Sequence, residues 1–376
     1  MMPDQVSFTV ANTHEQLQAL SQELSREALI GVDSEANSLH AYRERLCLLQ
    51  FSTPTQDAVV DPLLLPDLSS LASVFSNPQI EKIFHAAEYD LIVLYRDLGF
   101  TLSNLFDTMV AARILGRKKV GLGNLLEEEF GIHLEKRFQR ADWGQRPLRP
   151  EMLEYARMDT HHLIELRHKL KDELQARERW EIAREDFARQ PSLIPTLAEP
   201  PQQDIWRIKG ARDLTPRQAA ILQELAVYRE SRAAQADQPL FKIISDTTLS
   251  AIAASQPQSA KDLESLEGMT PGQVRRHAKG LLAAVRRGEQ SPPLRRPRRE
   301  PYDEAYVERL DKLRAWRKAA ALEMDVESDV VLPKDLMQAV AKANPNSPEA
   351  LAGLLSQVPW RLARFGAEIL SALKPS

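Results

Sequence analysis

Residues 28–35 of the chain read ALIGVDSE. The apolar run Ala28–Val32 has the length of a buried strand, and two carboxylates, Asp33 and Glu35, stand at its end. Side chains at positions i and i+2 of a strand point to the same face, so both carboxylates should leave the sheet side by side. The alternative is a turn-forming Asp-Ser pair that ends the strand.

Short apolar runs and helical patterns alternate around this stretch. Further strand-like runs are Leu46–Phe51, Ala58–Val60 and Ile83–Phe84, and helical spacing is found in Asp67–Phe75, Asp90–Leu98, Leu105–Leu115 and Leu122–Phe130. A long helix is expected from Pro150, a proline in a first helical turn, to about Ala188. Strands followed by helices predict an α/β domain, a mixed sheet flanked by helices.

Two proline-rich stretches, 190–203 and 291–301, divide the chain. The segments that follow them are helical by pattern and resemble each other at an offset of about 88 residues. Tyr228-Arg229 corresponds to Trp316-Arg317, Pro257 to Pro345 and Pro271 to Pro359. Two copies indicate a duplicated domain rather than a solenoid. We therefore expect three domains, at 1–195, 204–290 and 302–376, the last two small and all-helical.

The composition limits the class of protein. Hydrophobic residues make up 43% of the 376 and charged residues 27%, which is enough to bury real cores. Cys47 is the only cysteine, so an internal disulfide or a cysteine-based metal cluster is excluded. The amino terminus lacks the features of a signal peptide, and no apolar run reaches the ~20 residues that cross a bilayer. We expect a cytoplasmic protein that makes no membrane contact.

Charge is unevenly distributed along the chain. Residues 1–200 hold 22 basic and 31 acidic side chains, and residues 201–376 hold 27 basic and 22 acidic ones. Within 271–299, nine basic residues stand against Glu289 alone. This pattern would suit a metal-using enzyme that also holds a polyanion. A solvated helix face followed by an arginine-rich linker explains the same run.

Two more aspartates stand out by their context. Asp90 opens a helix directly after a strand, where an ordinary N-cap aspartate also belongs. In the helix after Pro150, Asp159 interrupts an otherwise apolar stripe. A carboxylate on a buried face must be paired, protonated or bound to metal, so the alternative to metal is a buried arginine partner. Tyr155 lies one turn earlier on the same face.

The four acidic side chains are hard oxygen ligands, and no cysteine or histidine cluster accompanies them. They are Asp33, Glu35, Asp90 and Asp159. Such a set favours Mg²⁺ or Mn²⁺ over Zn²⁺. Two such ions, ~3.5–4 Å apart, activate a water and stabilise both the attacking and the departing oxygen of a phosphodiester. Phosphodiester hydrolysis with two divalent cations is the chemistry that this set predicts.

The order of these motifs resembles that of a known superfamily. Asp33-x-Glu35, then Asp90, then Tyr155-x-x-x-Asp159 is similar to the three exonuclease motifs of the tyrosine-containing DEDD group, which has an RNase H-like fold. Residues 136–148, KRFQRADWGQRPL, are similar to the segment that precedes the third motif in ribonuclease D. Both helical copies resemble the HRDC domain. One exonuclease domain followed by two HRDC-like domains is the arrangement of the ribonuclease D family.

This resemblance implies a set of roles. Asp33 would bridge two cations, Glu35 and Asp159 would complete the site of the attacking water, and Asp90 would hold the second ion through water. Tyr155 would orient the attacking water. The resemblance further implies 3'→5' cleavage of RNA with release of 5'-mononucleotides, and precursors of tRNA and other small structured RNAs as substrates.

Six further residues are candidates for substrate contacts. They are His85, Lys136, Gln139, Arg140, Trp143 and Arg146. The polar residues between 136 and 146 could contact phosphate or sugar. His85 could instead be a satisfied histidine at a strand end, and Trp143 could stack on a base or anchor a loop.

Two other functions fit the same residues. One is a DNA 3'→5' exonuclease, which would use the same ligand order, although the pair of HRDC-like domains favours RNA. The other is a catalytically inactive RNA-binding adaptor, against which the complete set of acidic residues argues. We expect the enzyme to act as a monomer.

Overall fold

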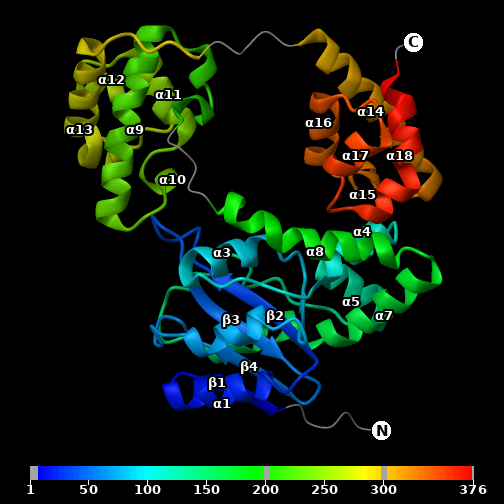
Figure 1. Cartoon of the computed structure of the whole chain (residues 1–376). Helices are drawn as coiled ribbons and strands as arrows, with labels where there is room; N and C mark the ends of the chain where they lie inside the picture. The colour runs from blue at the N-terminus through cyan, green and yellow to red at the C-terminus, as the bar shows by residue number, and fades with distance from the viewer. Residues whose placement is uncertain (1–6, 199–203, 298–302, 375–376) are drawn as a thin grey trace. The chain divides into compact units, whose positions relative to one another are not determined.

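The computed structural model describes residues 7–198, 204–297 and 303–374 (Figure 1). Within them the chain divides into two compact units. One unit contains residues 7–36, 46–198 and 303–374, and the other contains residues 37–45 and 204–297. The unit that contains residues 303–374 holds the sheet and the second helical domain. The other unit, with residues 204–297, holds the first helical domain. No helix in these ranges is long and apolar enough to cross a membrane.

Six strands form one mixed sheet. They are β1 (Ser7–Ala11), β2 (Leu29–Ala36), β3 (Leu46–Ser52), β4 (Gln56–Val60), β5 (Glu81–Phe84) and β6 (Leu105–Asp107). Their order across the sheet is β1-β4-β3-β2-β5-β6. β3 runs antiparallel to β2 and β4, and the other neighbouring pairs are parallel. The predicted fold class is confirmed, and β2, with its two carboxylates, lies inside the sheet between β3 and β5.

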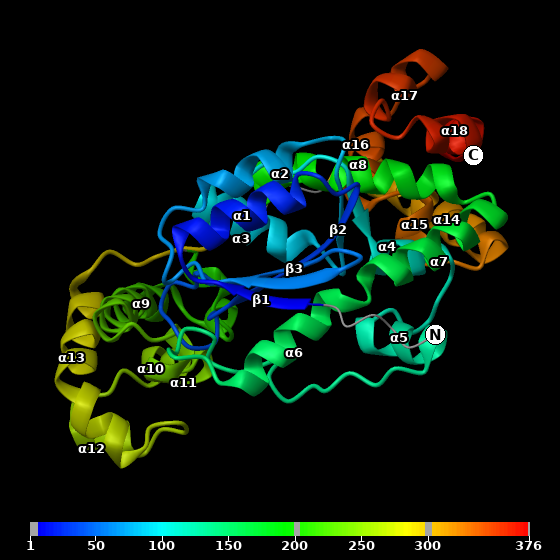
Figure 2. The same ribbon diagram turned by 90° about the horizontal axis from the view of Figure 1, so that it is seen from below.

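Helices cover both faces of this sheet (Figure 2). One face carries α1 (His14–Leu24), η1 (Ser69–Leu71), α2 (Ala72–Ser76) and α3 (Glu88–Leu98). The other face carries α4 (Thr108–Ile114), α5 (Leu122–Phe130), α6 (Pro150–His161) and α7 (Leu163–Ala176). Helix α8 (Trp180–Leu197) packs beside β6. Adjacent residues of β5 show this division. Phe84 packs in the core with α3, and Ile83 packs in the core with α7.

The pattern between 102 and 115 was mispredicted. A helix was expected over Leu105–Leu115, but the first three residues form the edge strand β6. The Asp107 side chain accepts hydrogen bonds from the backbone N–H of Met109 and Val110, and so caps α4. An N-cap residue has non-helical backbone angles, so the helix begins only after Asp107.

The long helix predicted from Pro150 to Ala188 is also wrong, because the chain forms α6, α7 and α8 there. In addition, α8 continues through Pro191 and Pro195, where a linker was expected. Each proline inside a helix costs about 3 kcal/mol, and the burial of Ile194 in the core of the sheet offsets part of that cost. Residues 199–203 of the expected linker lie outside the described residues.

The two helical domains repeat one pattern. The first contains η2 (Ile205–Arg207), η3 (Ala211–Asp213), α9 (Pro216–Ala236), α10 (Leu240–Ile243), α11 (Asp246–Ser255), α12 (Ala260–Glu264) and α13 (Pro271–Gln290), and the second contains α14 (Glu304–Met324), α15 (Ser328–Val331), α16 (Lys334–Ala343), α17 (Pro348–Leu354) and α18 (Pro359–Leu373). Each helix from α14 to α18 begins 88 residues after its counterpart, which matches the offset seen in the sequence.

Candidate active site

β2 presents two carboxylates toward α6. Asp33 and Glu35 share one face of the strand, while Ile30 and Val32 point into the core on the opposite face. Gly31 precedes Asp33 on the α6 face, and a Cβ atom there would lie 3.0 Å from the carbonyl oxygen of Thr160. The missing side chain therefore lets the end of α6 approach the strand closely, next to the carboxylates.

α6 supplies the third carboxylate. Oxygen atoms of Asp33, Glu35 and Asp159 all lie within 4.8 Å of one another. Tyr155, one turn before Asp159, is half-buried, and its ring contacts that of Trp143, with the ring centres 6.1 Å apart. The structure thus brings together, from a strand and a helix more than 100 residues apart in the chain, the residues that the sequence analysis selected.

Asp90 lies beside this trio rather than within it. It is the third residue of α3 and is buried, so the N-cap alternative is wrong. The Ser34 hydroxyl, from the residue between the two β2 carboxylates, donates a hydrogen bond of 2.5 Å to Asp90 Oδ1. Asp107 fixes the approach to α3, because its carboxylate accepts hydrogen bonds from the backbone N–H of Ala86 and Ala87.

Desolvation, and after it repulsion between neighbouring carboxylates, shifts the acids of this cluster toward their neutral forms. Burial raises the pKa of Glu35 to about 9, with Asp159 and Asp90 adding to the shift. Burial also raises the pKa of Asp90 and of Asp159 to about 7. The pKa of Asp33 lies well above its usual value, first through burial and then through Asp90, Asp159 and Glu35. Burial and the nearby carboxylates raise the pKa of Tyr155, so its phenol remains a hydrogen-bond donor.

The donor set fits divalent cations. In residues 7–198, 204–297 and 303–374, no lysine or arginine lies within ion-pair distance of any of the four acids. The alternative of an arginine partner for Asp159 is therefore not what the structure has. Asp33, Glu35 and Asp159 are partly exposed and Asp90 is buried, and clustered carboxylate oxygens of this kind are ligands that Mg²⁺ and Mn²⁺ prefer.

Gln50 is a neighbour that sequence analysis did not select. It is directly opposite Asp33 in the β2–β3 ladder, so both side chains lie on the same face. The side chain is fully buried, and within the described residues neither its amide nitrogen nor its amide oxygen has a hydrogen-bond partner. The sequence feature that could have identified Gln50 is its position as a polar residue within the apolar run Leu46–Phe51.

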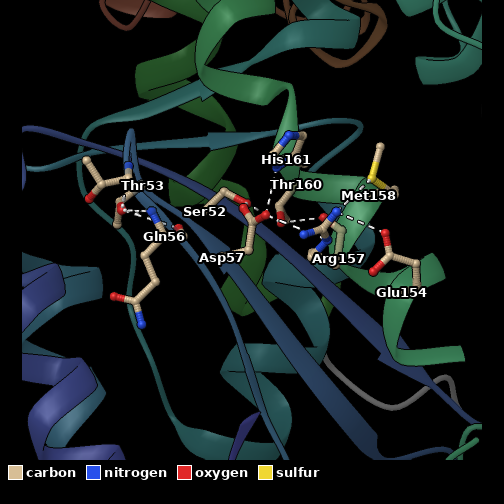
Figure 3. Close-up of polar contacts among 10 residues, drawn as sticks. Ser52, Thr53, Gln56, Asp57, Glu154, Arg157, Met158, Thr160 and His161 are labelled. Atoms are coloured by element: carbon tan, nitrogen blue, oxygen red, sulfur yellow. Dashed lines mark hydrogen bonds and ion pairs between the residues drawn. The ribbon is translucent and has the colours of Figure 1, made fainter. Parts of the chain in front are cut away.

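A buried network anchors α6 to the sheet (Figure 3). Asp57 of β4 is 1% exposed, and its carboxylate lies 2.7 Å from His161 Nδ1 and accepts a 2.6 Å hydrogen bond from Ser52 Oγ. The Ser52 hydroxyl also lies 2.7 Å from the hydroxyl of Thr160. Figure 3 shows Ser52 of β3 and His161 in the last turn of α6 pointing toward Asp57 of β4. The network fixes the helical turn that carries Asp159.

The candidates for substrate contacts divide into two groups. Lys136, Gln139 and Arg140 are exposed. Trp143 is 1% exposed and packs in a core with Tyr155, which corresponds to the loop-anchor alternative and leaves no free face for stacking on a base.

The other two candidates also have protein partners. The guanidinium of Arg146 binds both carboxylate oxygens of Asp61 and the backbone carbonyls of Cys47, Trp143 and Gln145. His85 Nδ1 lies 2.9 Å from the Thr108 hydroxyl, as expected of a satisfied histidine at a strand end. The expectation that Arg146 contacts a phosphate is therefore corrected, because its guanidinium N–H groups already donate hydrogen bonds that hold the 136–148 loop in place.

A cavity of about 580 Å³ opens beside the acidic cluster. It is lined by His133, Leu134, Glu135, Arg137, Pro150, Glu151, Glu154, Tyr155, Met158 and Asp159. Arg137 and Met158 were not selected from the sequence, since nothing in their local pattern marks them. The cavity has room for a nucleotide-sized group next to Tyr155 and Asp159.

Comparison with known proteins gives a consistent result. The model of a 3'-5' exonuclease family matches residues 8–175, and that of the HRDC domain matches residues 218–285 and 307–373. Ribonuclease D of Gluconacetobacter diazotrophicus is 30% identical over 379 residues, which cover 98% of this chain and 93% of that protein. The crystal structure of Escherichia coli RNase D, described as an exoribonuclease involved in structured RNA processing, is 25% identical with a TM-score of 0.70 and covers 93% of this chain and 99% of its own. The catalytic core of RRP6 from Trypanosoma brucei is 30% identical with a TM-score of 0.64 and covers 77% of this chain and 82% of its own.

Proposed function

This chain belongs to the ribonuclease D family of 3'-5' exonucleases, and we propose that it hydrolyses the 3'-terminal phosphodiester bond of RNA and releases 5'-mononucleotides. The substrates on this proposal are precursors of tRNA and other small structured RNAs. The similarity to the E. coli enzyme, which extends over nearly the whole of both chains, supports a structured RNA.

One observation carries the catalytic part of the proposal. Three carboxylates meet within 4.8 Å, a fourth lies beside them, and in the described part of the chain no basic side chain pairs with them. Asp33, Glu35 and Asp159 would hold one divalent cation, and Asp33 together with Asp90 would hold a second. Bound there, the two ions would lower the pKa of a water molecule and stabilise the charge on the departing oxygen.

The remaining side chains position the reactants. The Tyr155 hydroxyl remains protonated and orients the attacking water by a hydrogen bond. Among the residues that the structure describes, the donor and the acceptor of the buried Gln50 amide have no partner, and we assign the amide to a hydrogen bond with water or substrate on the same face as Asp33. Lys136, Gln139 and Arg140 are exposed polar groups that precede the third motif, and they supply contacts to the substrate backbone.

The test is hydrolysis of a 3'-extended tRNA transcript, labelled at its 5' end, with Mg²⁺ or Mn²⁺ and with a chelator. A ladder that shortens from the 3' end only in the presence of metal supports the proposal. The Asp33→Asn variant, which keeps the shape of the side chain, should produce no ladder. Metal-dependent cleavage by Asp33→Asn at the normal rate would refute the assigned site.

Matched RNA and DNA oligonucleotides separate the remaining alternatives. A preference for RNA requires contacts to the 2'-hydroxyl, whereas a DNA exonuclease would cleave the deoxy substrate at least as fast. RNA binding without any metal-dependent cleavage would instead identify an inactive adaptor.

A further inference from the structure

Helix α13 of the first helical domain packs against α9 through one face. This face consists of Val274, His277, Leu281, Ala284, Val285 and Gly288. Gly288 lies so close to α9 that a Cβ atom would be 2.3 Å from the Cα of Ile221, and Gly280 is in similar contact with the ring of Tyr228. The close packing fixes which side of α13 remains outside.

The outer side of α13 is basic. Arg275, Arg276, Lys279 and Arg286 are all exposed, and within the described ranges none of them makes an ion pair. Residues 275, 279 and 286 are four and seven positions apart, so they form one stripe along the helix. Arg287, next to this stripe, is different because its guanidinium binds Glu224.

The second helical domain offers an internal comparison. Its helix α18 begins 88 residues after α13, so the positions equivalent to the four basic residues are Ala363, Arg364, Ala367 and Lys374. Of the two cations that remain, Arg364 is paired with Glu368.

Another arginine of α18 is used for packing. Arg361 is fully buried, and its guanidinium binds Glu185 and Asp186 of α8, at 2.9 Å each, and the backbone carbonyl of Val330. In the same unit, Arg113 of α4 binds Asp329, with 2.6 Å between nitrogen and oxygen. The second domain therefore uses Arg361 and Asp329 to join the exonuclease domain.

We propose that the two copies have different tasks: the outer face of α13, formed by Arg275, Arg276, Lys279 and Arg286, binds the phosphate backbone of RNA, and the second copy is a structural support that binds no RNA. The proposal rests on the proposed function for the identity of the polyanion. A row of cations that have no ion-pair partner in the described ranges, on a helix without exposed aromatic residues among them, fits sequence-independent phosphate contacts. The chemistry that the face recognises is therefore the repeated charge of the RNA backbone.

Equilibrium binding tests this division without requiring catalysis. The full-length protein, in chelator, is titrated into a fluorescent single-stranded RNA at several KCl concentrations. Each phosphate contact contributes ~0.7 to the slope of log K against log salt for a single strand. The variant R275A/R276A/K279A/R286A should reduce the slope by about 3. Because the four side chains are exposed, its thermal unfolding should match that of the wild type.

The matched control alters the equivalent positions of the second copy, R364A/K374A. This control should leave affinity and slope within error of the wild type. Unchanged binding by the α13 variant would overturn the proposal, and so would an equal loss in both variants. A protein that binds RNA through α13 but fails to cleave it would refute the proposed exonuclease activity on RNA and leave this inference standing.

Discussion

Binding of Mg²⁺ to the acidic cluster should release two or more protons at pH 7, because Asp33, whose pKa is also raised, adds its proton to those of Asp90, Asp159 and Glu35. The carboxylates at Asp90 and Asp159, with pKa values of about 7, are then about half protonated, and Glu35, at about 9, is almost entirely protonated. A cation requires their ionised forms, so metal and protons compete. Since two or more protons are exchanged, the apparent affinity for Mg²⁺ should rise at least about 100-fold per pH unit near pH 7. The rise should become shallower above about pH 9, where Glu35 has ionised.

Isothermal titration calorimetry measures this release directly. The observed enthalpy at pH 7 is compared in buffers of different ionisation enthalpy, and the slope of that plot gives the number of protons. Glu35→Gln should lower the number by about one, while Glu308→Gln, which changes an exposed glutamate on α14, should not alter it. A release of less than about half a proton would show that the cluster is already ionised without metal and would refute the electrostatic argument.

The same linkage predicts how pH affects the metal-free fold. A carboxyl whose pKa is raised on folding contributes its stability below the pKa of the unfolded chain and loses it as pH rises through the folded value. Between about pH 4 and pH 9 the melting temperature in chelator should therefore fall, and added Mg²⁺ at pH 8 should restore it.

Three substitutions examine other parts of the site and its support. Gln50→Met removes a buried amide that has no hydrogen-bond partner in the described part of the chain, so urea unfolding of the metal-free protein should show equal or greater stability, by up to ~2 kcal/mol, while kcat falls. Asp57→Asn weakens the anchor at His161 and should lower Mg²⁺ affinity about 10-fold, measured by calorimetry, with circular dichroism unchanged. Arg361→Ala leaves Glu185 buried without its partner and should cost about 3–5 kcal/mol in urea unfolding.

The sequence predicted those features of the site that depend on local periodicity. Asp33 and Glu35 follow the period of two of a strand, and Asp159 interrupts the period of a helix, so their directions could be derived from neighbouring residues. The pairing of β2 with β3 and α6, which brings these directions to one point, was available only through the resemblance of the motif order to a known superfamily.

Residues whose partners lie far away in the chain were harder to interpret. Arg146 is a residue type that often binds phosphate. Here its guanidinium donates instead to Asp61, 85 residues earlier in the chain, and to the carbonyl of Cys47, 99 residues earlier. The break between α6 and α7 has the same origin. The apolar stripe continues through it without a glycine or proline, while the tertiary contact between His161 and Asp57 lies at the break. Local pattern does not encode such contacts.

The two helical domains show why a count of charges misjudges binding surfaces. Residues 201–376 hold five more basic than acidic side chains, and that number treats every arginine alike. Arg361 is buried between two carboxylates, a state that is stable only because both partners and a carbonyl compensate its desolvation. Arg275 faces solvent without an ion-pair partner in the described part of the chain. Both residues lie on the last helix of the same fold, so secondary structure does not distinguish them. What distinguishes them is whether the surrounding domain supplies carboxylates, and only a cation without them has its charge available to a phosphate.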